Sequence, residues 1–176
     1  YQTDVAIPGD ARLALEALAE AVSGAGASRN AAGTVAAAKK AKFDAFQALA
    51  SSDDTPIKPE RLVAAVNRVL DPDATVVCDP GTPCPYFSAF YRNPLTGRHF
   101  ISNRAHGALG YAMSAAVGAH IGRPGVKTVA VMGDGSFGFT CGELETVTRL
   151  NLPITFIVVS NSVFGWIKAG QRHGFD

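Results

Sequence analysis

The sequence predicts an α/β fold, a three-layer doubly wound parallel sheet preceded by helical segments. The stretches "ATVVCD" (74–79), "VKTVAVMGD" (126–134) and "PITFIVVSN" (153–161) are apolar runs, as expected for strands that are buried on both faces. Helical patterns alternate with these strands, which is typical of parallel sheets covered by helices on both sides. The small residues of "GYAMSAAVGAHIG" (110–122) favour a helix that packs closely on such a sheet.

Three helices are expected before the first strand. Asp10 is the expected N-cap of "DARLALEALAEAV", whose apolar residues have helical spacing. Residues 23–34 are rich in Gly, Ala and Ser and indicate a loop, and "TVAAAKKAKFDAFQALA" (34–50) follows as a second helix. Pro59 then opens the third helix, "PERLVAAVNRVL", after a polar linker.

Shorter elements fill the space between the strands. The pattern predicts a helix over "CPYFSAFY" (84–91), a short strand at "RHF" (98–100) and a helix over "CGELETVTRLN" (141–151). The change in composition near residues 51–58 predicts a boundary between a first part, 1–50, and a domain, 51–176. Because that domain stops soon after a strand, we expect it to be incomplete at its C-terminus and the chain to be a segment of a longer protein.

The overall composition excludes several classes of protein. The chain has 176 residues, 47% of them hydrophobic, and a formal net charge of +1, so it is globular and has no electrostatic preference for nucleic acid or an anionic membrane. No apolar run is long enough to span a bilayer. The three cysteines form no C-x-x-C pair and indicate reduced thiols in a cytoplasmic protein: Cys78, Cys84 and Cys141.

The stretch "VAVMGDGSFGF" (129–139) places a glycine-rich turn directly after a predicted strand. Residues 133–138 match G-x-G-x-x-G, and Gly133 and Gly135 would let backbone amides approach phosphate oxygens closely. A dinucleotide site also needs an acidic residue at the end of the next strand, but that strand ends in Ser160 and Asn161. An NAD(P)-binding oxidoreductase domain therefore stays only as a disfavoured alternative.

A divalent metal explains the same turn better. Asp134 follows one strand and Asn161 follows the next, and in a right-handed βαβ unit these two ends lie side by side. A carboxylate and an amide oxygen suit Mg²⁺, which takes its remaining ligands from phosphates and water. The pair is therefore predicted to hold a diphosphate through the metal, while glycine amides hold it directly.

The long stretch "GDGSFGFTCGELETVTRLNLPITFIVVSNSVFG" (133–165) resembles the thiamin diphosphate motif, a G-D-G that is followed after a helix and a strand by N-N. Ser160 stands where the family usually has the first Asn, whereas Asn161 matches the second, metal-binding one. Upstream, "VVCDPGTPCPYFSAFY" and "ISNRAHGALGYAMSAAVGAHIG" resemble the diphosphate domain of acetolactate synthase-like enzymes. "YQTDVAIPGDARLALEALAEAV" resembles the end of their central domain.

This resemblance implies roles for individual residues. The metal ligands would be the side chains of Asp134 and Asn161 and the backbone carbonyl of Val163. The diphosphate would be held by the turn at Gly133, by the amides of Gly135 and Ser136, and by the loop with Gly81 and Thr82. Gly107 would accept a bond from the aminopyrimidine, and Leu109 would be the apolar wedge that bends the cofactor. His106 could face the substrate or only hydrogen-bond in the core.

The resemblance implies decarboxylation of a small 2-oxo acid with carboligation, dependent on thiamin diphosphate and Mg²⁺. The family's catalytic glutamate lies in a pyrimidine-binding domain, which another segment or a separate subunit must supply, and a homodimer or homotetramer is expected. Binding of FAD by a central domain stays open. Two further alternatives are a split-subunit decarboxylase of phosphono- or sulfopyruvate type and a non-catalytic module with this fold.

Overall fold

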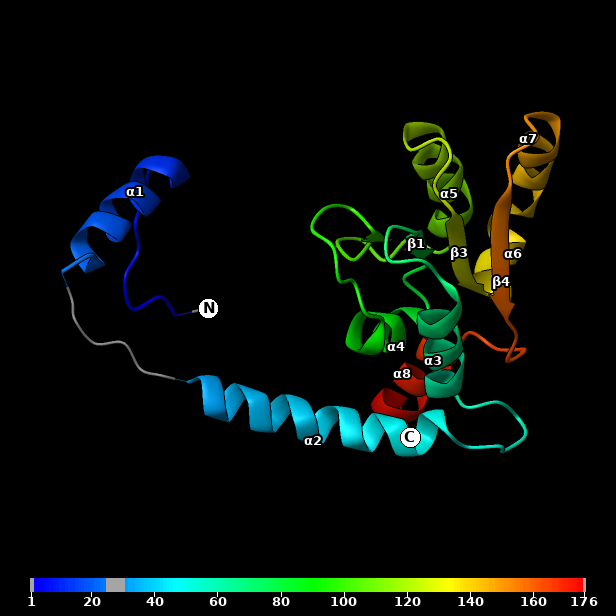
Figure 1. The fold of residues 1–176 in the computed structure, drawn as a ribbon, viewed down its shortest axis with the longest axis horizontal. Coiled ribbons are helices and arrows are strands. Elements are labelled where there is room, and N and C mark those ends of the chain that lie inside the picture. The colour runs from blue at the N-terminus through cyan, green and yellow to red at the C-terminus, as the bar shows by residue number, and fades with distance from the viewer. Residues whose placement is uncertain (1, 25–30, 176) are drawn as a thin grey trace. The chain divides into compact units, whose positions relative to one another are not determined.

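The computed structural model describes residues 2–24 and 31–175, whose helices and strands can be followed by colour in Figure 1. The chain divides into two compact units, Tyr1–Lys40 and Ala41–Asp176, so the division falls inside α2 (Ala32–Ala50). The first unit holds α1 (Ala11–Val22), and the Asp10 carboxylate accepts a hydrogen bond of 3.0 Å from the Leu13 amide, which confirms the predicted N-cap. Within the predicted loop over 23–34, residues 25–30 lie outside the described residues, and the prediction is wrong at its end because α2 already begins at Ala32.

The second unit is built on a parallel sheet in the order β2-β1-β3-β4. Its strands are β1 (Thr75–Cys78), β2 (Phe100–Ser102), β3 (Thr128–Gly133) and β4 (Ile154–Val159). Residue 75 pairs with residue 128, and Gly133 at the end of β3 pairs with Val159 at the end of β4. The parallel sheet was predicted, although the second strand lies two residues later than "RHF" suggested.

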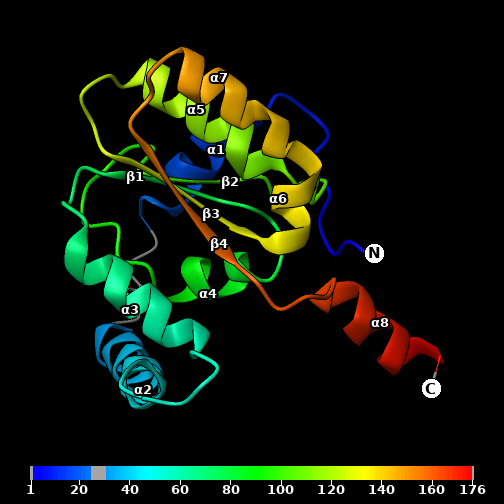
Figure 2. The same cartoon turned by 90° about the vertical axis from the view of Figure 1, so that its right-hand side faces the viewer.

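Helices cover both faces of this sheet, as Figure 2 shows. On one face, α3 (Pro59–Val69), α4 (Pro83–Phe90) and the C-terminal half of α2 pack against side chains such as Val76 and Val131. On the other face, α5 (Tyr111–Gly122) packs against Val77, Ala130 and Met132. Successive residues of a strand thus serve opposite clusters, which is why β1 and β3 are apolar at consecutive positions.

The small residues of α5 allow it to lie close to the sheet, since Ala112 and Ala116 are fully buried. The predicted helix over 141–151 is divided into a 3₁₀ turn, η1 (Cys141–Glu143), and α7 (Leu144–Arg149). The helix α8 (Gly165–Phe175) was not anticipated, because its three glycines lower its helical propensity. Within the two described ranges, every helix is too short or too polar to span a bilayer.

The glycine-rich stretch after β3 differs from its sequence-based interpretation as a loop. Gly133 is extended, and from Asp134 onward the chain is helical, forming α6 (Asp134–Thr140). The helix can begin there because an acidic residue in the first turn interacts favourably with the helix dipole. Ser136 in this turn is buried, so the turn is packed against the sheet edge rather than projecting from it.

Candidate functional site

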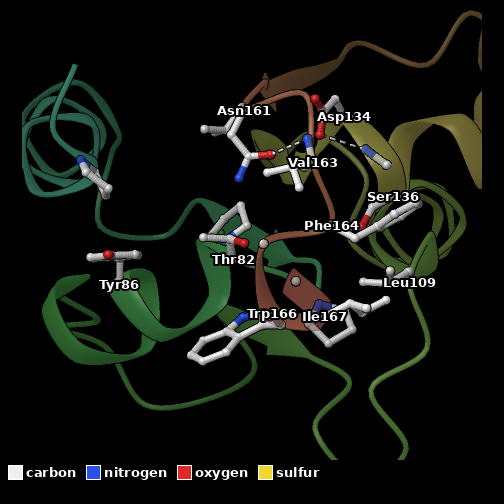
Figure 3. A pocket seen from close by; sticks show the side chains of 18 of the residues that line it. Thr82, Tyr86, Leu109, Asp134, Ser136, Asn161, Val163, Phe164, Trp166 and Ile167 are labelled. Carbon is white, nitrogen blue, oxygen red and sulfur yellow. Dashed lines mark hydrogen bonds between the residues drawn. The ribbon is translucent and has the colours of Figure 1, made fainter. Parts of the chain in front are cut away.

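A cavity of about 380 Å³ opens at the carboxyl ends of β1, β3 and β4 (Figure 3). This is the edge of a parallel sheet at which ligands bind in open α/β folds. All of the cofactor and metal residues that the sequence suggested line this cavity: Gly81, Thr82, Gly107, Leu109, Gly133, Asp134, Gly135, Ser136, Asn161 and Val163. Their convergence places the motifs from 79–82, 107–109, 133–136 and 161–163 around one space.

Asp134, the first residue of α6, accepts three hydrogen bonds with its carboxylate. Its Oδ1 accepts from the Gly135 amide at 2.9 Å. Its Oδ2 accepts from the Ser160 hydroxyl at 2.9 Å and from the Ser162 amide at 2.7 Å. Partial burial raises the pKa of Asp134, but the Ser160 hydroxyl and the neighbouring backbone amides outweigh burial, so this pKa lies below its usual range. The carboxylate is therefore ionised at neutral pH, with lone pairs left for a further ligand.

Asn161 belongs to the turn that follows β4. Its Oδ1 accepts a hydrogen bond of 3.1 Å from the Val163 amide (Figure 3), and Ser162 between them has a left-handed backbone with φ of 55°. The Ser160 hydroxyl, one residue earlier, reaches across to Asp134. Ser160, the one departure from the N-N pattern, thus joins the Ser162 amide in linking the turn after β4 to Asp134.

The donor set at this end of the cavity fits a hard divalent cation. A carboxylate from Asp134, an amide oxygen from Asn161 and the backbone carbonyl of Val163 are oxygen donors of the kind that Mg²⁺ prefers. None of the residues that line the cavity in the described part of the chain is a His or Cys, the ligands typical of zinc. The residues present therefore fit magnesium.

Asp79 was overlooked by sequence reasoning. It follows β1 and is fully buried, and its Oδ1 accepts a hydrogen bond of 2.6 Å from the Ser136 hydroxyl. Its Oδ2 accepts from the Ala112 amide at 3.1 Å. The N-cap of α5 is Gly110, which has no side chain to bond that amide, so Asp79 takes over the capping role from a distant part of the sequence. Asp79 could have been identified from the sequence as a site residue, because it follows an apolar strand directly, as Asp134 does.

Two glycines lie at close approaches around the cavity, and at one of them, Gly135, there is no room for a side chain. A Cβ on Gly135 would lie 2.5 Å from Cε1 of Phe164, whose ring therefore rests on the G-D-G turn. A Cβ on Gly81 would meet the Leu109 side chain at 3.4 Å and the Ser136 hydroxyl oxygen at 3.5 Å. These positions let the two turns approach each other across the space between them.

The remainder of the cavity wall is largely apolar. It is formed by Pro59 and Leu62 of α3, by Tyr86 and Phe87 of α4, and by Trp166 and Ile167 of α8. Figure 3 shows Thr82 lying between this apolar part and the Asp134–Asn161 end. The cavity thus has a polar end for an anion and a metal, and an apolar body.

His106 lies elsewhere. It is exposed and is not among the residues that line the cavity, although its neighbour Gly107 is, with a left-handed φ of 68°. The geometry gives no support to His106 as a residue facing substrate, and its role stays a prediction.

Comparisons with known proteins address the same segment. Residues 79–176 match the family model described as "Thiamine pyrophosphate enzyme, C-terminal TPP binding domain". Acetolactate synthase of Bacillus subtilis (strain 168) is 37% identical over 120 residues, which cover 67% of this chain and 20% of that protein. The acetolactate synthase large subunit of Haemophilus influenzae is 33% identical over 115 residues, covering 65% of this chain and 20% of that protein. The chain thus spans about a fifth of the length of these relatives.

Proposed function

Since this chain belongs to the thiamine pyrophosphate enzymes, in an acetolactate synthase-like branch, we propose that it holds the diphosphate end of the cofactor in an enzyme that decarboxylates a 2-oxo acid and ligates the product to a second carbonyl compound. The observation that carries this proposal is the meeting of Asp134 and Asn161 on one cavity with the turn at Gly81 and Thr82. The match to the family model supports the cofactor, and the relatives support the reaction.

The metal would be Mg²⁺, held by the Asp134 carboxylate, the Asn161 amide oxygen and the Val163 carbonyl. Hydrogen bonds to the Asp134 carboxylate keep its charge available at neutral pH. The amides of Gly135 and Ser136 and the turn at Gly81 and Thr82 would hold the diphosphate directly, because both turns line the cavity. The Gly135 amide, which donates to Asp134 Oδ1, would be shared between that carboxylate and the diphosphate.

The cofactor, when bound, supplies carbanion stabilisation after attack on the 2-oxo acid. The residues of this chain would bind and orient the cofactor and exclude water from the site. Gly107 and Leu109 line the cavity, where they would supply an acceptor and an apolar support for the cofactor rings. Phe164, Trp166 and Ile167 would keep water from the reacting carbon on the α8 side.

We further propose that the site is completed by a pyrimidine-binding domain from another segment or subunit, in a homodimer or homotetramer in the cytoplasm. Among the described residues, Asp134 is the one carboxylate that lines the cavity, and it faces the metal end. Phe139, Phe164 and Trp166 are respectively 65%, 48% and 59% exposed beside the cavity, and apolar surface of this kind is typical of an interface. The glutamate that activates the cofactor would come from that partner.

Calorimetric titration of thiamin diphosphate into the full-length enzyme tests this function. We expect binding with Mg²⁺ and its loss with EDTA, while NAD does not bind. Replacing Asp134→Ala should weaken cofactor binding at least about 100-fold, because even the outer partners of metal ligands are worth about 10–100-fold. Ser160→Ala, which removes such an outer partner, should weaken it by about tenfold. The exposed Asp71→Ala is the matched control. Unchanged binding in Asp134→Ala would refute the metal site.

A further inference from the structure

Two cysteines enclose the turn that carries Gly81 and Thr82. Cys78 is the last residue of β1, and Cys84 lies in the first turn of α4. Both are fully buried and belong to the same hydrophobic cluster. Neither lines the cofactor cavity, so the proposed function gives them no role.

The sulfur of Cys84 has polar surroundings. It lies 3.1 Å from the Ser102 hydroxyl and 3.5 Å from the Ser88 hydroxyl, and the Arg104 guanidinium donates a hydrogen bond to it at 3.2 Å. A structural cysteine in a core packs as a small apolar side chain and is inert, whereas a nearby guanidinium favours the reactive thiolate. Cys84 therefore combines burial with the environment of a reactive cysteine.

The interaction between the two cysteines makes them chemically unequal. A hydrogen bond from Cys78 is the largest cause that lowers the pKa of Cys84, to about 4, and it outweighs burial, which acts in the opposite direction. The same hydrogen bond, together with burial, raises the pKa of Cys78. Of the two thiols, Cys84 therefore gives up its proton more readily, and Cys78 is the hydrogen-bond donor.

The Cys84 sulfur lies close below the surface. Ser88 and Arg104, which both contact it, are exposed residues. We expect a reagent of about the size of water to reach this sulfur past the exposed Arg104 side chain, and a bulky alkylating reagent to be excluded because Cys84 itself is fully buried. Cys141, the third cysteine, is exposed, and its sulfur lies 4.0 Å from the Gly138 carbonyl oxygen, so it offers an internal comparison.

We propose that Cys78 and Cys84 form a redox-active dithiol, which hydrogen peroxide converts to a disulfide. The Cys84 thiolate attacks one peroxide oxygen, the O–O bond breaks, and the products are a sulfenic acid on Cys84 and hydroxide. The Cys78 sulfur then attacks the Cys84 sulfur, an S–S bond forms, and the sulfenic hydroxyl leaves with the Cys78 proton as water. The two sulfurs are oxidised by two electrons in total and the peroxide is reduced. The bond closes a ring around residues 79–83.

Peptide mapping by mass spectrometry of the full chain tests this, after exposure to peroxide and without reduction. We expect a Cys78–Cys84 crosslinked peptide that forms before Cys141 is oxidised and that dithiothreitol reverses. In Cys78→Ser, oxidation should stop at a sulfenic acid on Cys84, which dimedone traps. In Cys84→Ser, Cys78 should stay reduced. A bulky maleimide should label Cys141 and spare Cys84, which verifies that each protein is folded.

Arg104→Met tests the activating contact, with Arg104→Lys as the variant that keeps the positive charge. We expect Arg104→Met to slow oxidation of Cys84 about tenfold relative to Cys141 in the same molecule, and Arg104→Lys to restore most of the rate. Oxidation of Cys141 in the wild-type chain with no crosslink between Cys78 and Cys84 would overturn the proposal. Oxidation of the two cysteines does not require bound cofactor, so these experiments are independent of the test of the proposed function.

Discussion

Replacing Asp79→Ala should destabilise the folded chain substantially. The change removes the acceptor of the Ser136 hydroxyl and of the Ala112 amide, both in buried surroundings. Hydrogen bonds to a charged partner are each worth about 1.5–3 kcal/mol, so the two bonds together are worth about 3–6 kcal/mol. Burying the carboxylate itself is unfavourable, and losing that penalty offsets part of the sum. We therefore expect the free energy of unfolding to fall by about 3 kcal/mol.

Asp79→Asn separates the hydrogen bonds from the charge. The Ala112 amide can only donate, so the oxygen of the new side chain must face it. The amide nitrogen then faces the Ser136 hydroxyl, which can turn and accept. Both contacts survive with the Ser136 bond reversed, and we expect a loss of only about 1 kcal/mol.

Urea-induced unfolding of the full chain, followed by circular dichroism, measures these differences. Asp71→Ala is the control, since Asp71 is exposed, and it should stay within about 0.5 kcal/mol of the wild type. An Asp79→Ala protein as stable as this control would refute the capping role. If Asp79→Asn were as unstable as Asp79→Ala, the charge rather than the two bonds would be responsible.

Three further changes test the packing around the site. Gly110→Ala places a side chain where φ is 89°, and its Cβ would lie 3.0 Å from two side-chain atoms of α6. The melting temperature should therefore fall by an amount equivalent to about 2 kcal/mol or more. An unchanged melting curve would contradict these contacts. Phe46→Ala removes a buried ring that stacks on Phe90 at 4.4 Å between centroids. Unfolding in urea should show a free energy of unfolding lower by about 3–5 kcal/mol. A decrease of less than about 1 kcal/mol would contradict the packing of α2 on this core. Glu145→Gln breaks an exposed ion pair with Arg149 at 2.9 Å, and in the same assay the free energy of unfolding should change by less than about 0.5 kcal/mol. A larger decrease would show that the pair stabilises the fold more than a surface ion pair does.

Much of the fold could be predicted because it depends on local patterns. The central strands β1 and β3 are mainly apolar at consecutive positions, because helices cover both faces of the sheet. Asp10 and Pro59 mark helix starts that need only neighbouring residues. The approach of Asp134 and Asn161 to one cavity follows from strand topology, which the sequence also predicts. These features depend either on residues that are close in sequence or on the general right-handedness of βαβ connections.

The overlooked features depend on partners that are distant in sequence. Asp79 acts through Ser136 and Ala112, and no pattern around "CDPGT" identifies either of them. Ser160 looked like a departure from a motif, and only the structure shows its hydroxyl bonded to Asp134. The helical start of α6 was missed because glycines dominate the turn, although packing against the sheet edge determines its conformation.

The strand order determines when each strand can pair as the chain leaves the ribosome. Among the four strands of the described sheet, β1 leaves the ribosome before the others. It is central and pairs with β2 and β3, so it has no neighbour in this sheet until residues near 100 and 128 have emerged. Pairings of such separation in sequence form slowly, and an unpaired apolar strand is prone to association with other chains. The cavity also needs the turn after β4, which emerges later still. The nascent chain therefore assembles its hydrophobic layers first and becomes competent to bind a ligand only after the fourth strand is in place.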